Sequence, residues 1–526
     1  MKKILRSVSI VFTAAALICG CTQITDELPD SYRETDIITE PDTSPMTSFT
    51  EQTVFTISET SSITSETFIS KAETSNSSEI LTEIETVTSS ETETAAPTVT
   101  VTETETSSVT VSEAEFIPGT IPPETTAATL PSITVVTIPT LPEATESTSA
   151  ESIAQETEAY YPQNGYYPLN FDRQKAVWVS YLEYDRIMRG ADEAEFTNAL
   201  NACFDNIAAL GCNTVYFQTR VYGDSYYNSS LFPKGDRLTG DYDPLEIAVK
   251  SAHDRGLSIH AWINPMRLMT DSQMKSYPES YNIGKWYNDP AVNGKYIVNV
   301  SGRWYLNPAY AETVSLICDG ISEIVTAYNV DGIQIDDYFY PTTDPSFDST
   351  AYAASGTSLS LADWRRDNVT KMVKKMYEAV HSANSGALFG ISPQGNTDNN
   401  FNELYADIYT WCSTSGCCDY ICPQIYFGFE NGAQPYAETV DKWDKLVTAP
   451  GIKLVIGLAA YKSGTEDKYA GAGSSEWINS HDILARQRDL TDIYNAGYAF
   501  FRYDSLFLPD PAVAVSVNAE LENLRK

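Results

Sequence analysis

Residues 331–338 read Asp-Gly-Ile-Gln-Ile-Asp-Asp-Tyr, a short β-branched run that ends in two adjacent carboxylates. β-Branched residues such as Ile333 and Ile335 favour extended backbone. An apolar run of this kind is typical of a strand that is buried on both faces of a parallel sheet. An ionised carboxylate is costly to bury unless it is paired or used. The segment therefore predicts a parallel strand with a candidate functional site at its carboxyl end.

Seven further apolar runs have the same character and alternate with helical periodicity. They are residues 176–181, 214–219, 257–263, 387–392, 419–426, 453–460 and 497–503. Between them, Phe196, Leu200 and Phe204 share one helix face, Asp243 precedes a proline as an N-cap would, and Gly211 is placed as a helix stop. Eight strands, each followed by a helix, predict an α/β fold of the (β/α)8 TIM-barrel type.

An open doubly wound sheet is the alternative fold. Such sheets usually carry a glycine-rich phosphate loop after the first strand, and residues 181–185 contain no glycine. The barrel is therefore the favoured prediction.

The first 21 residues have the layout of a bacterial lipoprotein signal peptide. Lys2, Lys3 and Arg6 precede an apolar run at 8–18, and Gly20 precedes Cys21 in a lipobox-like position. The run is too short to span a bilayer. We expect export, lipidation of Cys21, and attachment to the outer face of the cell membrane; ordinary cleavage to a secreted protein is the alternative.

Residues 22–165 form an acidic linker rich in Ser, Thr and Glu. Between Thr22 and Tyr160 there are 26 acidic residues and only two basic ones, Arg33 and Lys71. A segment so polar and self-repelling cannot bury a core, so we expect a disordered stalk before a catalytic domain at 166–526. The net charge of −37 excludes nucleic acid as an expected partner.

Seven cysteines lie in the predicted domain, at positions 203, 212, 318, 412, 417, 418 and 422. An odd number on apolar helix faces and strands indicates buried free thiols rather than a disulfide framework. The four histidines have no metal-ligand spacing, and Walker and Gly-x-Ser-x-Gly motifs are absent. We expect no metal and no cofactor, which leaves carboxylate chemistry.

Catalytic residues of a TIM barrel lie where its strands end. Asp336 is predicted to face the barrel mouth as nucleophile or charge stabiliser. Strand alternation turns the Asp337 side chain the other way, where it either orders the next loop or takes part in catalysis. Asp224, in the second-strand turn beside Arg220, is ranked first as the proton donor. A strand-end salt bridge and turn is the alternative for that pair.

Other polar and aromatic residues after the strands are predicted to bind substrate, because sugars need hydrogen bonds and aromatic faces. They are Arg220, Asn264, Arg267, Tyr338, Gln394, Gln424, Tyr426, Tyr461, Asp504, Glu183 and Trp304. Asp504 and Glu183 are also candidates for the second catalytic carboxyl group. Residues 264–307 are too long for a routine connection and contain Trp286 and Trp304, so they are a candidate cleft wall.

Nine short motifs in order resemble the glycosyl hydrolase-like 10 family of bacterial barrel proteins over about residues 173–510. They are Ala-Val-Trp-Val-Ser at 176–180, Asn-Thr-Val-Tyr-Phe-Gln-Thr-Arg at 213–220, Gly-Asp-Ser-Tyr-Tyr at 223–227, Ala-Trp-Ile-Asn-Pro at 261–265, Tyr-Leu-Asn-Pro at 305–308, the 331–341 segment, Trp-Arg-Arg-Asp-Asn at 364–368, Gly-Ile-Ser-Pro at 390–393 and Pro-Gln-Ile-Tyr at 423–426. The resemblance implies a TIM-barrel glycosidase, and one branch of that family cleaves peptidoglycan glycan strands stripped of peptides.

The 331–338 segment is also similar to the strand motif of family 18 chitinases. Gln334 and Tyr338 stand where that motif has an aspartate and the proton-donating glutamate. A substrate-assisted mechanism of the family 18 type is therefore not expected.

Together these observations predict a surface-anchored, monomeric glycosidase whose partners are a polysaccharide substrate and the membrane. Peptide-free peptidoglycan strands are the favoured substrate, and chitin-like or plant glycans come next. A glycan-binding barrel without catalytic activity is the alternative class.

Overall fold

The computed structural model describes residues 165–526, in which eight parallel strands close into a barrel. In spatial order the strands are β1 (Lys175–Val179), β11 (Gly497–Phe501), β10 (Lys453–Ala459), β9 (Tyr420–Ile421), β8 (Leu388–Ile391), β7 (Gly332–Ile335), β3 (Ser258–Ile263) and β2 (Thr214–Arg220). β1 pairs with both β2 and β11. The predicted (β/α)8 fold is confirmed, and this closure rules out the open sheet.

Each predicted strand is present, although β9 is shorter than expected. The sequence pattern indicated a strand over 419–426, but regular pairing stops at Ile421. Pro423 has no backbone N–H to donate, and only isolated bridges from Gln424 to Gln394 and Gly457 continue the sheet. The chain therefore leaves the barrel early at this strand and frees the following side chains to turn into its mouth.

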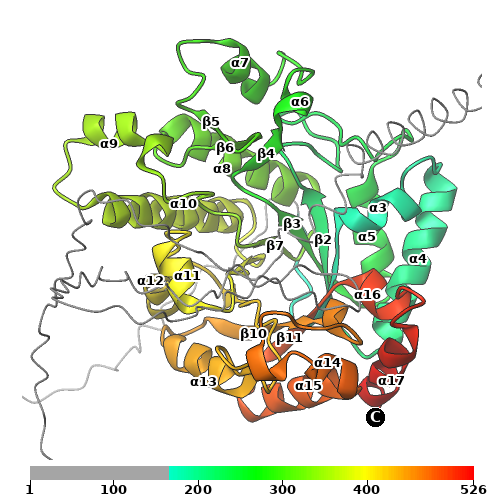
Figure 1. Cartoon of the computed structure of the whole chain (residues 1–526). Helices are drawn as coiled ribbons and strands as arrows, with labels where there is room; N and C mark the ends of the chain where they lie inside the picture. Colours follow the sequence, from blue (N-terminus) through cyan, green and yellow to red (C-terminus); the bar gives the residue numbers. More distant parts are fainter. Residues whose placement is uncertain (1–164) are drawn as a thin grey trace, which may run out of the picture. The chain divides into compact units, whose positions relative to one another are not determined.

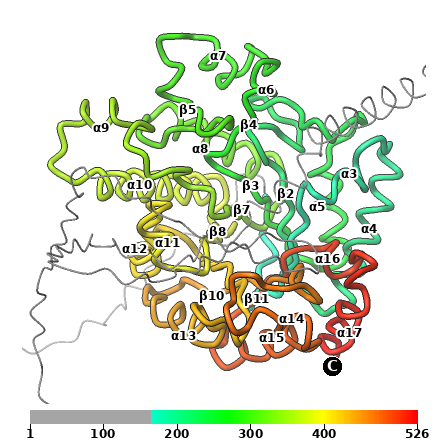
Figure 2. Tube along the Cα trace, viewed as in Figure 1, coloured from blue at the N-terminus to red at the C-terminus, as the bar shows by residue number. Residues whose placement is uncertain are grey.

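Helices surround the strands (Figures 1 and 2). Those between barrel strands are α3 (Tyr181–Ile187), α4 (Glu193–Ala209), α5 (Pro244–His253), α8 (Ala311–Ala327), α9 (Ser349–Ser355), α10 (Leu361–Ala383), α11 (Thr397–Asn402), α12 (Ile408–Ser413), α13 (Tyr436–Leu446), α14 (Glu476–Asn479) and α15 (Ile483–Ile493). The 3-10 turns η1 (Pro345–Phe347), η2 (Ala460–Lys462) and η3 (Gly471–Gly473) lie in the loops, and α16 (Tyr503–Phe507) and α17 (Ala514–Leu524) end the chain.

The N-cap and the glycine helix ends that the sequence predicts are present. The Asp243 carboxylate accepts the backbone N–H groups of Leu245 and Glu246 at the start of α5. Gly211 and Gly256 have φ angles of +81° and +67° after α4 and α5, which the left-handed turn at a helix end requires. These local signals set the helix lengths between successive strands.

The connection between β3 and α8 is a small antiparallel sheet with two short helices. It consists of β4 (Arg267–Thr270), α6 (Asp271–Met274), α7 (Asn282–Asn288), β5 (Ile297–Val300) and β6 (Arg303–Leu306), with strand order β4-β6-β5. Figure 1 shows this insert in green beyond the ends of β2 and β3. It is a folded extension of the barrel with its own aromatic contacts.

Aromatic side chains fill the lower part of the barrel interior. The rings of Tyr216 and Tyr420 stack with centroids 6.0 Å apart, and His260 Nδ1 lies 2.9 Å from the Tyr420 hydroxyl. Burial lowers the pKa of His260 to about 4, so its imidazole is neutral at pH 7. These side chains fill the barrel interior on the amino-terminal side, and the fold places functional sites at the carboxyl ends of the strands.

Asp331 anchors the first described residues at the opposite end of the barrel. Its Oδ1 accepts the Tyr166 hydroxyl at 2.6 Å and the Leu169 N–H at 2.5 Å. Its Oδ2 accepts the Ile259 N–H at 2.7 Å and lies 3.0 Å from His253 Nε2. The fully buried carboxylate is thus satisfied in part by residues that precede β1.

We expect a shortened chain that begins at Gly165 to fold and keep its activity, whereas one that begins at Phe171 should be less stable. The second chain lacks two hydrogen bonds to the buried Asp331 carboxylate, which predicts a loss of about 2–4 kcal/mol. Urea denaturation of the two chains measures the difference. Equal unfolding midpoints would show that the network does not stabilise the barrel.

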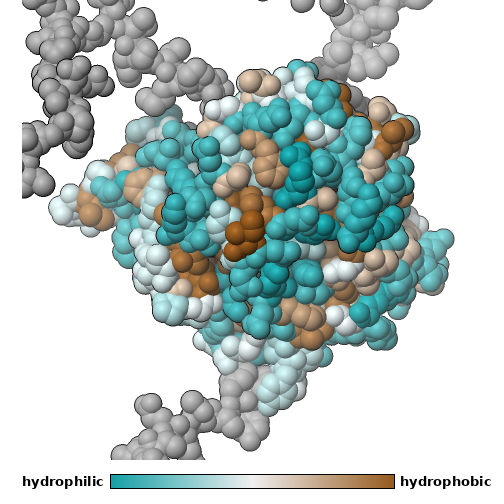
Figure 3. Space-filling view, turned by 90° about the horizontal axis from the view of Figure 1, so that it is seen from below, coloured by the Kyte–Doolittle hydropathy of each residue, from teal (hydrophilic) through white to brown (hydrophobic). Residues whose placement is uncertain are grey.

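The cysteine prediction is confirmed for the described residues. All seven cysteines are free thiols, and every one except Cys318 is buried. Figure 3 shows one face of the molecule that is mostly hydrophilic, with hydrophobic residues in small separate groups. Within residues 165–526 no helix is both long and apolar enough to cross a membrane. The predicted signal peptide, Cys21 and the linker lie outside the described residues, and the monomeric state stays a prediction.

Candidate functional site

A pocket opens at the carboxyl ends of the strands, where the fold predicts a site. Its lining residues are Trp178, Ser180, Tyr181, Leu182, Gln218, Trp262, Asn264, Arg267, Asp336, Asp337, Tyr338, Ser392, Gln394, Gly395, Asn396, Gln424, Tyr426, Phe427 and Phe501. Among these described residues, Asp336 and Asp337 are the only carboxylates and Arg267 is the only cation. The chemistry of the pocket therefore centres on the two consecutive aspartates.

Both aspartates point into the pocket because β7 ends at Ile335, just before them. Trp262 Nε1 donates to Asp336 Oδ2 at 3.1 Å, and Gln424 Nε2 donates to Asp337 Oδ1 at 3.1 Å. Asp336 is buried and Asp337 is half-buried. Strand alternation no longer applies beyond Ile335, so the expectation that Asp337 turns away from the mouth is wrong.

The surroundings of Asp336 and Asp337 shift the pKa values of the two carboxyl groups to different extents. Burial raises the pKa of Asp336 well above its usual range, and the neighbouring Asp337 raises it further against smaller opposing effects of Trp262 and Arg267. Burial also raises the pKa of Asp337, but hydrogen bonds from Gln394 and Gln424 lower it. Two such carboxyl groups side by side favour holding one proton between them, on Asp336.

Side-chain amides from four strand ends surround the aspartates. Gln424 also donates to the Ser392 carbonyl at 3.1 Å, which fixes its direction toward Asp337. Gln218 Nε2 approaches Asn264 Oδ1 at 3.4 Å, and its Oε1 accepts the Tyr181 N–H at 2.9 Å. These groups offer donors and acceptors without net charge, which suits hydroxyl and amide groups of a sugar.

Aromatic rings form the remaining wall. Phe501 lies at the centre of this group, with its centroid 5.8 Å from Trp178, 6.4 Å from Trp262 and 5.9 Å from Tyr426. The Arg267 guanidinium lies 4.3 Å from the ring centroid of Tyr338. Rigid aromatic faces beside hydrogen-bonding groups are typical of carbohydrate sites.

The barrel matches a known protein family. The model of the glycosyl hydrolase-like 10 family matches residues 174–471, which include all strands of the barrel except the last. The chain belongs to the glycosyl hydrolase-like 10 family. It is therefore a glycosidase, and the catalytic domain of this glycosyl hydrolase-like 10 protein is the barrel that holds the aspartate pair.

Two curated relatives are similar over much of the barrel. The glycosyl hydrolase DigH of Escherichia coli strain K12 is 32% identical over 341 residues, covering 59% of this chain and 76% of that protein. The glycosyl hydrolase YngK of Bacillus subtilis strain 168 is 32% identical over 321 residues, covering 55% of this chain and 61% of that protein. The glycoside hydrolase domain of PgaB from Bordetella bronchiseptica aligns in three dimensions with a TM-score of 0.45 and 14% identity, over 66% of this chain and 99% of that domain.

The structure brings eight of the predicted site residues of this family member into the pocket. They are Asp336, Asp337, Asn264, Arg267, Tyr338, Gln394, Gln424 and Tyr426. All except Arg267, which begins β4, follow the ends of β3, β7, β8 and β9, and these four strands are neighbours in the barrel. Their functional roles stay predictions, since their positions alone do not test catalysis.

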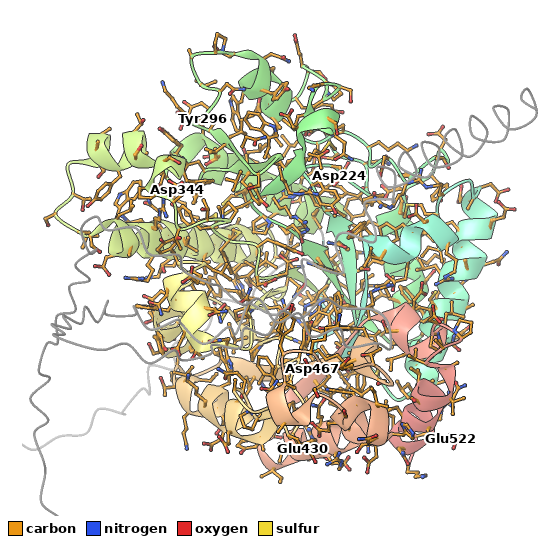
Figure 4. The ribbon with its side chains drawn as sticks, in the orientation of Figure 1. Asp224, Tyr296, Asp344, Glu430, Asp467 and Glu522 are labelled. Carbon is orange, nitrogen blue, oxygen red and sulfur yellow. The ribbon has the colours of Figure 1, made fainter. Side chains whose placement is uncertain are left out.

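Asp224 and Arg220 lie outside the pocket. Asp224 Oδ1 accepts the backbone N–H groups of Val221 and Tyr222 at 3.0 and 2.9 Å, so the carboxylate closes its own turn. Figure 4 shows Asp224 on the side of the green insert. The buried Arg220 guanidinium lies over the Phe232 ring at 4.7 Å. Asp224 therefore forms the turn of the structural alternative, whereas the salt bridge of that alternative is not observed, because the Nη atoms of Arg220 have no hydrogen-bond partner among the described residues.

Glu183 and Asp504 also have structural partners. Glu183 Oε1 accepts Arg502 Nη1 at 2.5 Å and the Asp504 N–H at 3.1 Å, while Oε2 accepts the N–H and hydroxyl of Ser180. Asp504 pairs with Arg186 at 2.6 Å. Because these bonds occupy both carboxylates beside the pocket, neither is placed to act as the second catalytic group.

Trp304 and Tyr461 are the last two predicted residues that do not line the pocket. Trp304 Nε1 donates to Asp271 Oδ1 at 3.1 Å, and its ring packs against Tyr287 within the insert. Tyr461 lies behind the pocket, with its ring 5.8 Å from that of Tyr426. Of the proposed cleft wall, only Asn264 and Arg267 reach the site.

Several lining residues were not singled out from the sequence. Trp178, Gln218, Ser392, Asn396 and Phe501 belong to this group. Trp178 and Phe501 lie in apolar strands, where an aromatic residue is usually part of a core. Their inward direction follows from strand alternation, but their meeting depends on the pairing of β1 with β11.

Proposed function

We propose that this glycosidase cleaves a cell-envelope glycan, with peptide-free peptidoglycan strands as its substrate, while a lipid on Cys21 holds it at the outer face of the membrane. The observation that carries the proposal is the Asp336–Asp337 pair in a pocket of aromatic rings and amides. Glycosidic cleavage needs one proton donor and one anionic group near the same bond. The pair supplies both.

Asp336 acts as the proton donor and Asp337 as the ionised partner. The raised pKa of Asp336, caused first by burial and then by Asp337, favours its protonated form, which can donate to the leaving oxygen. Amide hydrogen bonds from Gln394 and Gln424 lower the pKa of Asp337 and stabilise its charge. This assignment differs from the sequence prediction, which makes Asp336 the anion and Asp224 the acid.

The pocket chemistry supports peptidoglycan above the other glycans. Side-chain amides suit the acetamido groups of its sugars, and Arg267, the only cation among the described lining residues, suits the lactyl carboxylate of muramic acid. Chitin has no carboxylate and plant glycans lack acetamido groups. The resemblance of the sequence to a family with a peptidoglycan-cleaving branch points the same way.

Product analysis tests this function. The chain from Gly165 would be incubated with peptide-free peptidoglycan strands, intact peptidoglycan, chitin oligosaccharides and plant glycans, with Asp336→Asn as the inactive control. We expect fragments from peptide-free strands in greatest yield. Tight glycan binding without any fragments would favour the non-catalytic barrel, and a clear preference for chitin or plant glycans would replace the substrate.

The anchor prediction concerns residues outside the described part of the chain. Cys21→Ala should move the full-length protein from the membrane to the soluble fraction without loss of activity, because one lipid signal provides the attachment. Fractionation followed by immunoblotting measures this. Cys19→Ala, which changes a neighbouring cysteine, is the matched control and should stay membrane-bound; equal fractionation of both variants would refute lipidation at Cys21.

The acid–base pair predicts a bell-shaped dependence of kcat/KM on pH. Activity should fall at low pH as Asp337 gains a proton, with this limb above the ordinary aspartate value of 3.8, because burial raises its pKa. It should fall again at higher pH as Asp336 loses its proton. Circular dichroism across the same range controls for unfolding, and a profile without the alkaline limb would contradict Asp336 as the donor.

A further inference from the structure

The wall opposite the aspartates has no carboxylate among the described lining residues. In the barrel order, β11 is four strands from β7 in both directions, and β1 is its neighbour. The lining residues from β1, β11 and the start of α3 are Trp178, Leu182 and Phe501, which are apolar, and Ser180 and Tyr181, which carry hydroxyl groups. The Ser180 hydroxyl donates to Glu183 Oε2. Among the described lining residues, both carboxylates come from one side of the pocket.

The carboxylates beside that opposite wall already have hydrogen-bond or ion-pair partners. Glu183 is 0% exposed and accepts four hydrogen bonds, and Asp504 pairs with Arg186. Burial raises the pKa of Tyr426 well above its usual range, so this phenol is a poor anionic nucleophile. No free carboxylate of the described residues faces the aspartates across the pocket.

Glycosidases with two catalytic carboxyl groups place them on either side of the scissile bond, about 5–5.5 Å apart for retention or about 6.5–9.5 Å for inversion. Consecutive residues have Cα atoms only about 3.8 Å apart, and here both side chains enter from one strand end. Asp336 and Asp337 are therefore poorly placed to hold the anomeric carbon between them. A nucleophile from another source is required.

We infer that the substrate supplies this nucleophile, and that the enzyme acts on 2-acetamido sugars through attack of their own acetamido oxygen on the anomeric carbon. The inference rests on the proposed function and deepens it, since it names the chemical group that the site requires. It replaces the expectation drawn from the family 18 motif, because Asp336 and Asp337, and not residues at positions 334 and 338, supply the two carboxyl groups. The aromatic group around Phe501 lies beside Asp336 through the Trp262 hydrogen bond. It forms an apolar niche for the acetamido methyl group.

The reaction balances with the two aspartates and water. The acetamido oxygen bonds to C1 while the C1–O bond to the leaving sugar breaks, and Asp336 gives its proton to the leaving oxygen. Asp337 accepts the acetamido N–H proton, which leaves a neutral oxazoline. Water then attacks C1 and returns a proton to Asp336, the C1–O bond of the oxazoline opens, and Asp337 returns its proton to nitrogen.

The acetamido oxygen attacks the face of C1 opposite the leaving sugar, and water then attacks the face that this sugar left, so two inversions give net retention of configuration. The first experiment follows product anomers by NMR for matched glycans bearing N-acetyl, N-trifluoroacetyl or free amino groups. From the N-acetyl glycan we expect product with retained configuration. The N-trifluoroacetyl glycan should react at least tenfold more slowly, because fluorine lowers the nucleophilicity of the attacking oxygen. The glycan with a free amino group should not be cleaved. Inverted product, or equal rates for all three, would overturn the inference while leaving glycosidase activity in place.

The second experiment separates an enzyme nucleophile from a positioning carboxylate. Asp337→Ala would be assayed with azide, which replaces a missing carboxylate nucleophile and then yields a glycosyl azide of inverted configuration. We expect no such product, and we expect an N-acetylglucosamine thiazoline to bind competitively to the unmodified enzyme. Recovery of turnover with inverted azide, or a covalent sugar adduct on any side chain, would overturn the inference. Absence of cleavage of every glycan would instead refute the proposed function, and the inference with it.

Discussion

Asp336→Asn should lower kcat by about 10³- to 10⁴-fold, while glycan binding stays within a few-fold of the unmodified enzyme. An amide cannot protonate the leaving oxygen, but it can still accept the Trp262 Nε1–H bond that Asp336 accepts at 3.1 Å. The change therefore removes the proton and keeps the shape of the site. Turnover of a defined glycan and calorimetric binding measure the two parts of this prediction.

The leaving group provides a more specific readout. Substrates with activated aryl leaving groups need little protonation, so Asp336→Asn should lose far less activity on them than on natural glycans. Asp224→Asn is the matched control, since the same change falls on a buried aspartate that accepts hydrogen bonds in its own turn. Its folded fraction should keep turnover within about threefold. Near-normal hydrolysis by folded Asp336→Asn would refute the mechanism.

Arg365→Met should lower the free energy of unfolding by about 3–5 kcal/mol, because it leaves a buried carboxylate without its partner. Arg365 and Asp348 are both 0% exposed and are joined at 2.6 Å. The same guanidinium donates to the carbonyl oxygens of Thr342, Thr343 and Asp344 at 3.3, 3.2 and 2.8 Å. It thus fixes the loop that follows the aspartate pair.

The loss should also affect catalysis, since loosening residues 338–348 displaces Tyr338 and the Asp337 backbone. We expect kcat/KM at 20 °C to fall even where the protein is still folded. Lys371→Ala on the same helix, α10, is the control, because its ion pair with Asp367 is solvent-exposed and should contribute no more than about 0.5 kcal/mol. Similar unfolding curves for the two variants would show that the buried pair does not stabilise the loop.

The order of elements and the position of one of the two aspartates in the pocket could be predicted from local sequence. Apolar runs such as 214–219 predicted buried strands, and Asp243 and Gly211 predicted helix ends, because caps and strand burial depend on neighbouring residues alone. Two carboxylates after 331–335 marked the site for the same reason, since their burial would be costly without a use.

The composition of the pocket could not be predicted in the same way. Asp224 and Asp337 both follow strands, but Asp224 accepts the N–H groups of its own turn, whereas Asp337 extends past the end of β7 into the pocket. The difference depends on backbone direction after the last ladder hydrogen bond. Sequence alternation does not describe that direction.

What the sequence alone determined is therefore the (β/α)8 fold class, the order of strands along the chain and the strand end at Asp336 as the place of the site, since these follow from short-range patterns. Only the tertiary structure decided which side chains face the aspartates. Trp178 and Phe501 meet because β1 pairs with β11 across more than 300 residues of chain. The same closure brings Arg502 to Glu183, and the resulting ion pair occupies that carboxylate. Contacts between residues so distant in sequence depend on closure of the barrel, which no local pattern encodes.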